Sequence, residues 1–446
     1  MPTALINIGR TGAAAARASI ELTAQNIANA SNPDYARRTL RQNELVGSAT
    51  IGVNSADSLG GVLLGDIQRV DSVLVQRQAR ESAADLARTS AELDGLRLAE
   101  TALEESGLYL ALVDYEAALV SLESDPLDPA LRTVALETAR QLADTFQFAD
   151  SALGNARRLV QAEVEAGVAN VRGLAQELAR INRELTAARD GSAGQASLLD
   201  ARDATLRQIS DEFGIVTRFD EKGAVEVRLS AAPSPLLVQG GGFNTLSADR
   251  EADGSYRFRF GNLFFEADTG AMAGREAALV EFGRKQGAID RIAGAVIASG
   301  NAAQAAGVAP DGTPGQPLFS GANARSIGIA LSGGSGIATA GTGAGPGSRD
   351  TAALEGLIAA IGADGGPVAD TDEVLLTLSS RIAGLSTTRE GLSIIASAAE
   401  AQLLTETGVD LDAEAANLIR LQQAFEANSR VIRVATEIFD TILGLA

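Results

Sequence analysis

Residues 418–442 read LIRLQQAFEANSRVIRVATEIFDTI, and the apolar side chains of this stretch recur at alternating steps of three and four. That spacing places them on one face of a helix, as in the heptad seam of a coiled coil. The C-terminal seam comprises Leu418, Leu421, Phe425, Asn428, Ile432, Ala435, Phe439 and Ile442. A seam of this kind is buried only against a second helix, so the pattern predicts a partner helix.

A second seam with the same spacing lies at the opposite end of the chain, and it comprises Leu5, Ile8, Gly12, Ala15, Ser19, Leu22 and Asn26. We expect the two seams to pair, because one such helix alone buries too little apolar area to offset its ordering entropy. Asn26 and Asn428 lie inside the seams, where a polar residue costs stability but fixes register. The pattern favours equally a coiled coil within one chain and one between chains.

The segment between the two seams is mainly helical by the same criterion. Apolar spacing predicts a long helix from about Asp66 to Ser106, and Asp128 with Pro129 opens another as N-cap and first helical residue. From about residue 215 to 270 the period changes from helical to alternating, with turns at Gly-containing positions. This change predicts a small antiparallel β element.

These patterns predict a mainly α fold with a small antiparallel β element, long helices and a helical-bundle body. Paired terminal helices would form a coiled-coil domain from residues 1–65 and 405–446, and residues 66–404 would form the helix-rich body. A Gly- and Ser-rich segment at 332–349 is expected to be a mobile surface loop. It fits no phosphate-binding motif and joins no strand to a helix, which disfavours nucleotide binding.

The composition narrows the possible functions. With 37 Lys and Arg against 57 Asp and Glu, the net charge is −20, which repels phosphate backbones and anionic lipid heads. The chain has no His and no Cys, and with them it lacks imidazole bases, thiolate nucleophiles and the commonest metal ligands. We therefore expect no catalytic, cofactor-binding or metal-binding residues.

Two acids three positions apart, Asp200 and Asp203 in LLDARD, come nearest to a catalytic pair. They lack an adjacent nucleophile or metal-binding neighbour, so a structural role is favoured. We expect them in the first turn of a helix, where carboxylates interact favourably with the helix dipole. Arg202 and Arg207 would pair with nearby acids, including Asp203 and Asp211.

The first 28 residues carry Arg10, Arg17 and Glu21 at regular intervals. They form neither the apolar block of a cleavable signal peptide nor a membrane span. Export of this chain is therefore expected to use a route that reads no such signal.

Three stretches resemble a known family. Residues 22–38, LTAQNIANASNPDYARR, are similar to the N-terminal signature of bacterial flagellar axial proteins, which include rod, hook and hook-associated proteins. Residues 417–445, NLIRLQQAFEANSRVIRVATEIFDTILGL, resemble the C-terminal motif of the same proteins. The internal stretch SLLDARDATLRQISDEFGI, residues 197–215, is similar to one typical of the hook-associated protein 1 (FlgK) family.

This resemblance implies a structural, non-enzymatic role at the hook–filament junction, next to the hook, that allows the filament to assemble. The implied partners are further copies of the chain in a ring or helical array, hook protein, an FlgL-type junction protein, an FlgN-type export chaperone and the type III export apparatus. Neither nucleic-acid binding nor membrane insertion is implied. The implied location is extracellular, in the flagellum, reached without a cleaved signal peptide.

The resemblance also implies roles for residues of the N-terminal signature. Asn26 and Asn29 are expected to make register-setting hydrogen bonds between packed terminal helices, and Pro33 to turn the chain out of the inner tube. Tyr35 and the basic pair after it would begin a linker that contacts neighbouring subunits.

One feature departs from the family pattern. Members often carry an outward-facing β domain after a segment resembling GQPLFSGAN, residues 315–323, whereas here the chain passes almost directly to IGIALSGGSGIA. The outer domain is expected to be missing or vestigial. Two alternatives remain open: another axial component, such as a hook, distal rod or FlgL-type protein, and an enzyme such as a muramidase or protease. The LLDARD helix and the long body disfavour the first, and the missing His and Cys disfavour the second.

Overall fold

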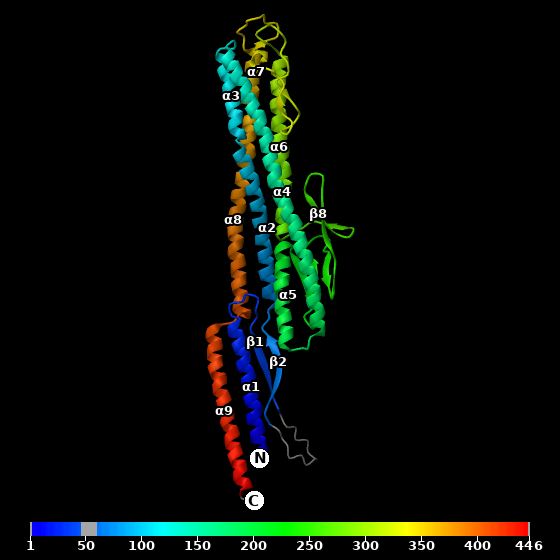
Figure 1. The fold of residues 1–446 in the computed structure, drawn as a ribbon, viewed down its shortest axis with the longest axis vertical. Helices are drawn as coiled ribbons and strands as arrows, with labels where there is room; N and C mark the ends of the chain where they lie inside the picture. The colour runs from blue at the N-terminus through cyan, green and yellow to red at the C-terminus, as the bar shows by residue number, and fades with distance from the viewer. Residues whose placement is uncertain (1, 46–59, 445–446) are drawn as a thin grey trace.

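The computed structural model describes residues 2–45 and 60–444 as an elongated molecule with both termini at one end (Figure 1). Its helices are α1 (Pro2–Ala28), α2 (Val73–Ser106), α3 (Leu108–Ser124), α4 (Pro129–Ala187), α5 (Ala193–Glu212), α6 (Ala271–Ala305), α7 (Ala352–Ile361), α8 (Pro367–Thr407) and α9 (Leu411–Leu443), with a 3-10 turn, η1 (Gly334–Gly336). Its strands are β1 (Arg38–Glu44), β2 (Val62–Arg69), β3 (Ile215–Phe219), β4 (Val225–Leu229), β5 (Leu236–Gln239), β6 (Gly242–Phe243), β7 (Leu246–Arg250), β8 (Tyr256–Phe260), β9 (Leu263–Phe265), β10 (Gly307–Val308), β11 (Phe319–Ser320), β12 (Gly328–Ile329) and β13 (Ala340–Gly341). The predicted mainly α fold with small antiparallel sheets is confirmed.

The body is a bundle in which α2, α4, α6 and α8 run side by side, with α3 and α7 at the end far from the termini (Figure 1). Its apolar core extends along the chain from Leu93 to Ile382, and Tyr115 and Phe146 within it are fully buried. Among the described residues, those of α1 and α9 contribute nothing to this core. No described helix is both long enough and apolar enough to cross a lipid bilayer.

Local capping residues fix where several helices begin and end. Asp128 caps α4 as predicted, because its Oδ1 accepts hydrogen bonds from the N–H groups of Ala130 at 2.6 Å and Leu131 at 3.3 Å. Gly107 separates α2 from α3 with φ of 70°, a left-handed conformation that favours glycine. Gly107 therefore interrupts the helix, and α3 continues to the far end of the body, where it packs against α4 (Figure 1).

The predicted β element consists of two antiparallel sheets, β3-β4-β5-β6 and β7-β8-β9, on one side of the bundle (Figure 1). The first hairpin pairs Ile215 with Leu229 and Phe219 with Val225, as the alternating pattern predicts. Phe213, at the end of α5, packs edge-on against Phe258 of β8 with ring centroids 5.1 Å apart. Aromatic packing thus joins the sheets to the helical core.

The helix predicted from about Asp66 starts too early, because residues 62–69 form β2. This strand pairs antiparallel with β1, and α2 begins only at Val73. Gly65 permits the pairing, since a Cβ at this position would lie 2.9 Å from the carbonyl oxygen of Arg41. Apolar spacing alone did not reveal this close backbone approach.

The segment at 332–349 is not a free loop along its whole length. Residues 337–340 are buried, and η1 just before them contacts α4. Arg132 donates hydrogen bonds to the carbonyl oxygen of Ile337 at 2.6 Å and to Oγ1 of Thr339 at 3.0 Å. The prediction of a mobile loop is therefore wrong for its first half. Across residues 319–351, all of which are described, the chain forms only η1 and short strands.

Candidate functional site: the terminal helix pair and its joint with the body

Helices α1 and α9 pack against each other within one chain (Figure 1). Glycines of α1 let the two backbones approach closely, because a Cβ at Gly9 would lie 2.8 Å from Cγ1 of Ile432. A Cβ at Gly12 would likewise collide with the side chain of Asn428. Of the two pairings that the sequence leaves open, this structure has the one within the chain.

The pairing covers the two seams unevenly. The buried members of the predicted site are Ala15, Leu22, Asn26, Tyr35 and Ala435. The half-buried members are Asn29, Leu418, Leu421, Asn428 and Ile432. The exposed members are Leu5, Ile8, Pro33, Phe425, Phe439 and Ile442. Burial is therefore concentrated toward the body, and the far end of the pair keeps apolar side chains in solvent.

The described residues of the chain leave a further apolar face of α9 exposed. Its members recur at steps of three and four, and we call them the outer stripe: Val431, Val434, Ile438 and Ile442. Their exposed fractions are 39%, 54%, 42% and 53%, respectively. Ile442 belongs both to this stripe and to the predicted seam, so α9 is apolar around more of its surface than one partner helix covers.

Asn26 does not bond across the helix pair, contrary to the prediction. Its Nδ2 donates to the carbonyl oxygen of Arg38 at 2.9 Å, and its Oδ1 accepts from the hydroxyl of Tyr35 at 2.8 Å. The turn after α1 folds residues 34–38, which we call the returning segment, back beside the last turn of the helix. The buried amide of Asn26 therefore makes its hydrogen bonds with the polar groups of this segment.

Asn29 and Asn428 also bond within their own helices rather than between them. Asn29 donates to the carbonyl oxygen of Gln25, and Asn428 donates to that of Ala424. The polar bond that does join the two helices runs from Nδ2 of Asn417 to Oγ1 of Thr23, at 3.1 Å. Register between α1 and α9 therefore rests on this bond and on the close approach at the glycines.

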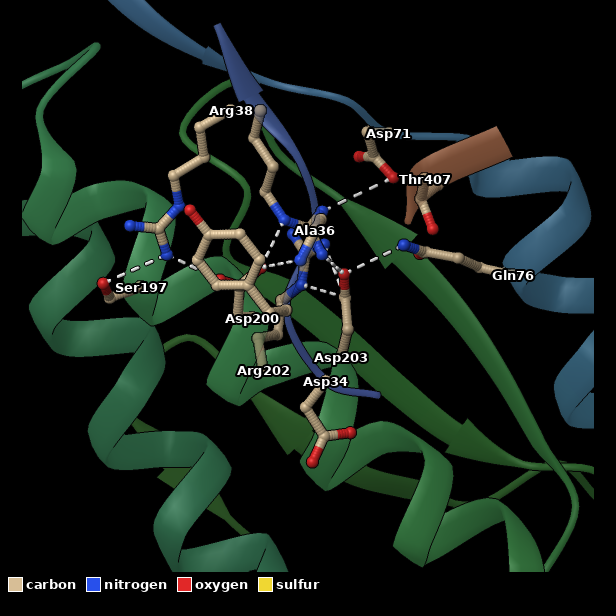
Figure 2. Close-up of polar contacts among 12 residues, drawn as sticks. Asp34, Ala36, Arg38, Asp71, Gln76, Ser197, Asp200, Arg202, Asp203 and Thr407 are labelled. Carbon is tan, nitrogen blue, oxygen red and sulfur yellow. Dashed lines mark hydrogen bonds and ion pairs between the residues drawn. The ribbon is translucent and has the colours of Figure 1, made fainter. Parts of the chain in front are cut away.

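Ion pairs centred on α5 connect the returning segment to the body (Figure 2). Asp200 accepts from Nη2 of Arg38 at 2.6 Å and from Nε of Arg69 at 2.7 Å. Asp203 accepts from Nη2 of Arg69 at 2.7 Å and from Nε2 of Gln76 at 3.0 Å. Both carboxylates are largely buried, so these pairs are screened little by solvent.

The structural role predicted for Asp200 and Asp203 agrees with these contacts, but their predicted position in the first turn is wrong. Helix α5 begins after Ser192, whose Oγ accepts from the N–H of Gln195 at 3.1 Å. The acids therefore lie beyond its second turn. Arg202 pairs with Asp203 as predicted, at 2.6 Å. Arg207 pairs instead with Asp34, from the returning segment.

We call the contacts that connect the returning segment, residues 34–38, to the body the joint. On its other side, the returning segment contacts the corner between α8 and α9. The N–H of Arg37 donates to the carbonyl oxygen of Thr407 at 2.8 Å, and its Nε donates to Glu414 at 2.7 Å. Glu414 is fully buried. Burial raises the pKa of the Tyr35 hydroxyl, so this phenol stays protonated and donates to Asn26. The segment predicted to contact neighbouring subunits thus also packs against its own chain.

The arrangement can position the terminal helix pair relative to the body. In the part of the chain that is described, no group of three His, Cys, Asp or Glu side chains is placed to hold a metal ion. Sequence reasoning missed Arg69, Gln76 and Glu414 as members of the joint. The available signal was opposite charge, in the basic pair that ends the N-terminal signature and in the two acids of LLDARD.

Comparisons with known proteins agree with this architecture. Residues 98–319 match the model of the flagellar hook-associated protein FlgK helical domain, and residues 401–445 match that of the flagellar basal body rod FlgEFG protein C-terminal region. Flagellar hook-associated protein 1 of Escherichia coli K12 is 24% identical over 251 residues, which cover 55% of this chain and 45% of that protein. The Bacillus subtilis protein of the same name is 23% identical over 228 residues, which cover 49% and 44%.

The matched region thus spans less than half the length of these relatives. The structure of the flagellar hook junction protein FlgK from Burkholderia pseudomallei matches with a TM-score of 0.49 and 20% identity, over 55% of this chain and 46% of that one. The two family models cover most of the body and α9, which pairs with α1. The chain therefore belongs to the FlgK family of flagellar hook-associated proteins.

Proposed function

We propose that this chain is a structural subunit of the bacterial flagellum that forms the hook–filament junction next to the hook and allows the filament to assemble. The observation that carries the proposal is the outer stripe of α9. A helix pair outside the body's core keeps four large aliphatic side chains about half exposed, which is unusual for a surface that has no partner.

The size of this apolar surface supports assembly with further copies. Complete burial of one Val or Ile side chain stabilises a protein by about 1.5–3 kcal/mol. The four side chains of the outer stripe are each about half exposed, so covering them would stabilise an assembly by roughly 3–6 kcal/mol per subunit. Repeated around a ring or helical array, such contacts would hold the terminal helices as an inner tube. In this proposal residues 1–65 and 405–446 form the inner domain and 66–404 the body, with the outer β domain missing or vestigial.

The proposed partners are other flagellar components. They are further copies of the chain, hook protein, an FlgL-type junction protein, an FlgN-type export chaperone and the type III export apparatus, and the location is extracellular. The names of the relatives support the hook-associated assignment. We propose no enzymatic activity. We also propose no binding to nucleic acid or to membranes, since the net charge of −20 repels phosphate backbones and anionic lipid heads.

Deletion of the gene from its flagellated bacterium tests the proposal. We expect electron microscopy to show hooks without filaments, filament protein to accumulate in the medium, and filaments to return when the gene is restored. The match of residues 401–445 to rod proteins favours, as a second candidate, another axial component. Loss of a hook or distal rod component would remove the hook itself, and filaments of normal length after deletion would contradict both functions.

A further inference from the structure

Two helices of the body carry long outward faces without charged residues, and the first of these helices is α4. Alternating steps of four and three residues lead from Val134 to Ala166, and none of the residues on this path, which we call the α4 face, is charged. Phe148 and Leu159 on the path are 55% and 58% exposed. Large apolar side chains exposed in a row on one helix mark a surface that contacts a partner.

The second such helix is α8. Steps of three and four residues lead from Leu376 by way of Gly391 to Thr405, again through uncharged residues only, and we call this path the α8 face. Leu376 is 63% exposed, and Ile394 on the same path is 72% exposed. Glu390 borders the face at one edge. Both faces therefore present apolar and uncharged polar side chains over about eight helical turns.

The bundle places the two faces on opposite sides of the body. Helices α2 and α6 pack against each other, and each contacts both α4 and α8, whereas α4 and α8 form no comparable interface within the described residues. In cross-section α4 and α8 therefore occupy opposite corners of the bundle. Core residues such as Phe146 of α4 and Leu378 of α8 lie on the other sides of these helices. One copy thus cannot cover its α4 face with its own α8 face.

Both helices run from the far end of the body toward the joint (Figure 1). The N–H of Arg37 in the joint donates to Thr407, the last residue of α8, and α4 is followed directly by α5, which carries Asp200. Copies that stand side by side in the same orientation around a common axis therefore bring the α4 face of one against the α8 face of the next, with the two helices parallel.

Charge and size favour another copy as the occupant of each face. The net charge of −20 makes copies repel one another, so they approach closely where acidic side chains are missing. The cores of subunit interfaces are likewise depleted in charged residues. A strip about 45 Å long and about 10 Å wide covers roughly 450 Å² on each copy, or about 900 Å² in total, close to the lower limit for a specific interface. Each copy makes the contact twice, once through each face.

We propose that the α4 face of one copy packs side by side against the α8 face of the next copy. This inference rests on the proposed function and names a contact between neighbouring subunits of the same ring or helical turn. Because the two faces differ, the contact is heterologous, and it repeats around the array instead of ending at a dimer. It joins the bodies, whereas the outer stripe of α9 joins the terminal helix pairs.

Cysteine cross-linking in assembled flagella tests the contact, because the chain has no cysteine of its own. Cells lacking the native gene would express two differently tagged copies. One copy carries Thr138→Cys or Asn155→Cys on the α4 face, and the other carries Ala383→Cys or Ala398→Cys on the α8 face. The possible combinations sample the register of the two helices. A short bismaleimide added to the isolated flagella should link the two kinds of copy in at least one combination.

The control combines the same α4 cysteines with Ala295→Cys, on the exposed side of α6. Mixed products that exceed this control in no combination would overturn the proposal. Linking of two copies that both carry Asn155→Cys, at a yield equal to or above that of the mixed product, would overturn it as well, because it would show a two-fold contact between α4 faces.

A matched pair of substitutions tests whether the α8 face is buried in the array. Ile394→Glu places a carboxylate on the face, and Ser393→Glu places one on the adjoining exposed side, about 100° around the helix. Both positions are exposed in the free chain, so neither variant should shift the unfolding curve of the purified protein. In flagella, Ile394→Glu should lower the amount of cross-linked product by about tenfold or more, because it buries an unpaired carboxylate, and Ser393→Glu should leave it unchanged. Equal amounts from the two variants would contradict the contact.

The outcomes separate this inference from the proposed function. If the cross-linked product stays at the control level while deletion of the gene removes filaments, the contact is wrong and the junction function stands. If deletion of the gene leaves filaments intact, the function is wrong. Cross-linking that Ile394→Glu abolishes and Ser393→Glu preserves supports both.

Discussion

At the residue scale, the joint depends on one carboxylate that serves two segments. Asp200 accepts from Arg38, the last residue of the returning segment, and from Arg69 at the end of β2. All three side chains are largely buried, so removing the carboxylate leaves two cations without their shared partner. Breaking a buried pair in this way costs far more than breaking an exposed one.

Asp200→Asn should therefore lower the stability of the joint by about 3 kcal/mol. Amide exchange of residues 36–40 measures this change as faster opening, while the body core stays protected. Glu21→Gln is the matched control, since the Arg17–Glu21 pair has side chains 75% and 62% exposed and should contribute less than about 0.5 kcal/mol. Similar exchange rates for the two variants would show that the ion pairs do not hold the joint.

A second residue-scale prediction concerns Glu276, whose pKa is raised from 4.5 to about 7 by burial and by the nearby Glu266. Between these values the folded chain holds a proton that the unfolded chain has lost, so stability falls as pH rises through this window. Glu276→Gln removes this loss. We expect it to raise the free energy of unfolding by about 1–2 kcal/mol at pH 8 and to change it little at pH 4.

Urea unfolding at both pH values measures the effect of Glu276→Gln. The exposed Glu105→Gln is the control, and it should shift stability by no more than about 0.5 kcal/mol at either pH. A gain from Glu276→Gln that is equal at pH 4 and pH 8 would contradict the assigned cause.

At the element scale, the terminal helices pair through close backbone contact instead of a large apolar interface. Gly9 approaches Ile432 and the backbone of α9, whereas Gly173, on the exposed face of α4, has open space where a Cβ would lie. The same residue type therefore has opposite consequences in the two helices. In α1 it permits packing, and in α4 it only costs conformational entropy.

Gly9→Leu should separate α1 from α9, because its side chain has no room beside Ile432. The expected result is loss of amide protection in both helices, with the unfolding transition of the body unchanged. Gly173→Ala should instead raise the free energy of unfolding by about 0.5–1 kcal/mol. Full protection of α1 in Gly9→Leu would mean that the helices do not pack as the structure has them.

A second element-scale prediction concerns the segment at 332–349. Arg132 is 2% exposed, and besides Ile337 and Thr339 it donates to the carbonyl oxygen of Pro126 at 2.5 Å. Arg132→Ala should therefore lower the free energy of unfolding by about 2–4 kcal/mol. Insertion of Gly-Ser after Gly345, where the segment is exposed, should change it by less than about 0.5 kcal/mol. Equal effects in chemical unfolding would contradict the division of this segment into packed and open halves.

Sequence pattern predicted elements well where a single helix or hairpin carries the signal. The seams of α1 and α9, the Asp128 cap and the β3–β4 hairpin all depend on residues close in the chain. The joint could not be predicted in the same way, because Arg38 and Asp200 are 162 positions apart and opposite charge alone does not select a partner. The spacing placed Asn26 on the seam, yet its amide donates a hydrogen bond to the carbonyl oxygen of Arg38. Arg38 comes beside Asn26 only because the chain turns back after Pro33.

At the scale of the whole molecule, the body and the terminal helix pair are held by different interactions. The body has a continuous apolar core from Leu93 to Ile382. The terminal pair is connected to it by hydrogen bonds and ion pairs at the joint, and its own apolar surface is only partly covered. The body thus has a core of its own, while the terminal pair lies outside this core and keeps the outer stripe exposed.

In the proposed function the outer stripe of α9 is an assembly surface and not part of the folded chain's own packing, and Val434→Asp tests this role. Val434 is 54% exposed, so a carboxylate there stays solvated in the free chain and would be buried without a partner in an array. Ile432→Asp is the matched comparison, since Ile432 packs against Gly9 within the chain. The measurement combines amide exchange of the purified chain with filament counts in cells that express each variant.

We expect Val434→Asp to keep wild-type protection in α1 and α9 and to produce cells without filaments, whereas Ile432→Asp should lose protection already in the free chain. If Val434→Asp supports filaments of normal number and length, or if it unfolds the terminal pair in the purified chain, the outer stripe is not the assembly surface.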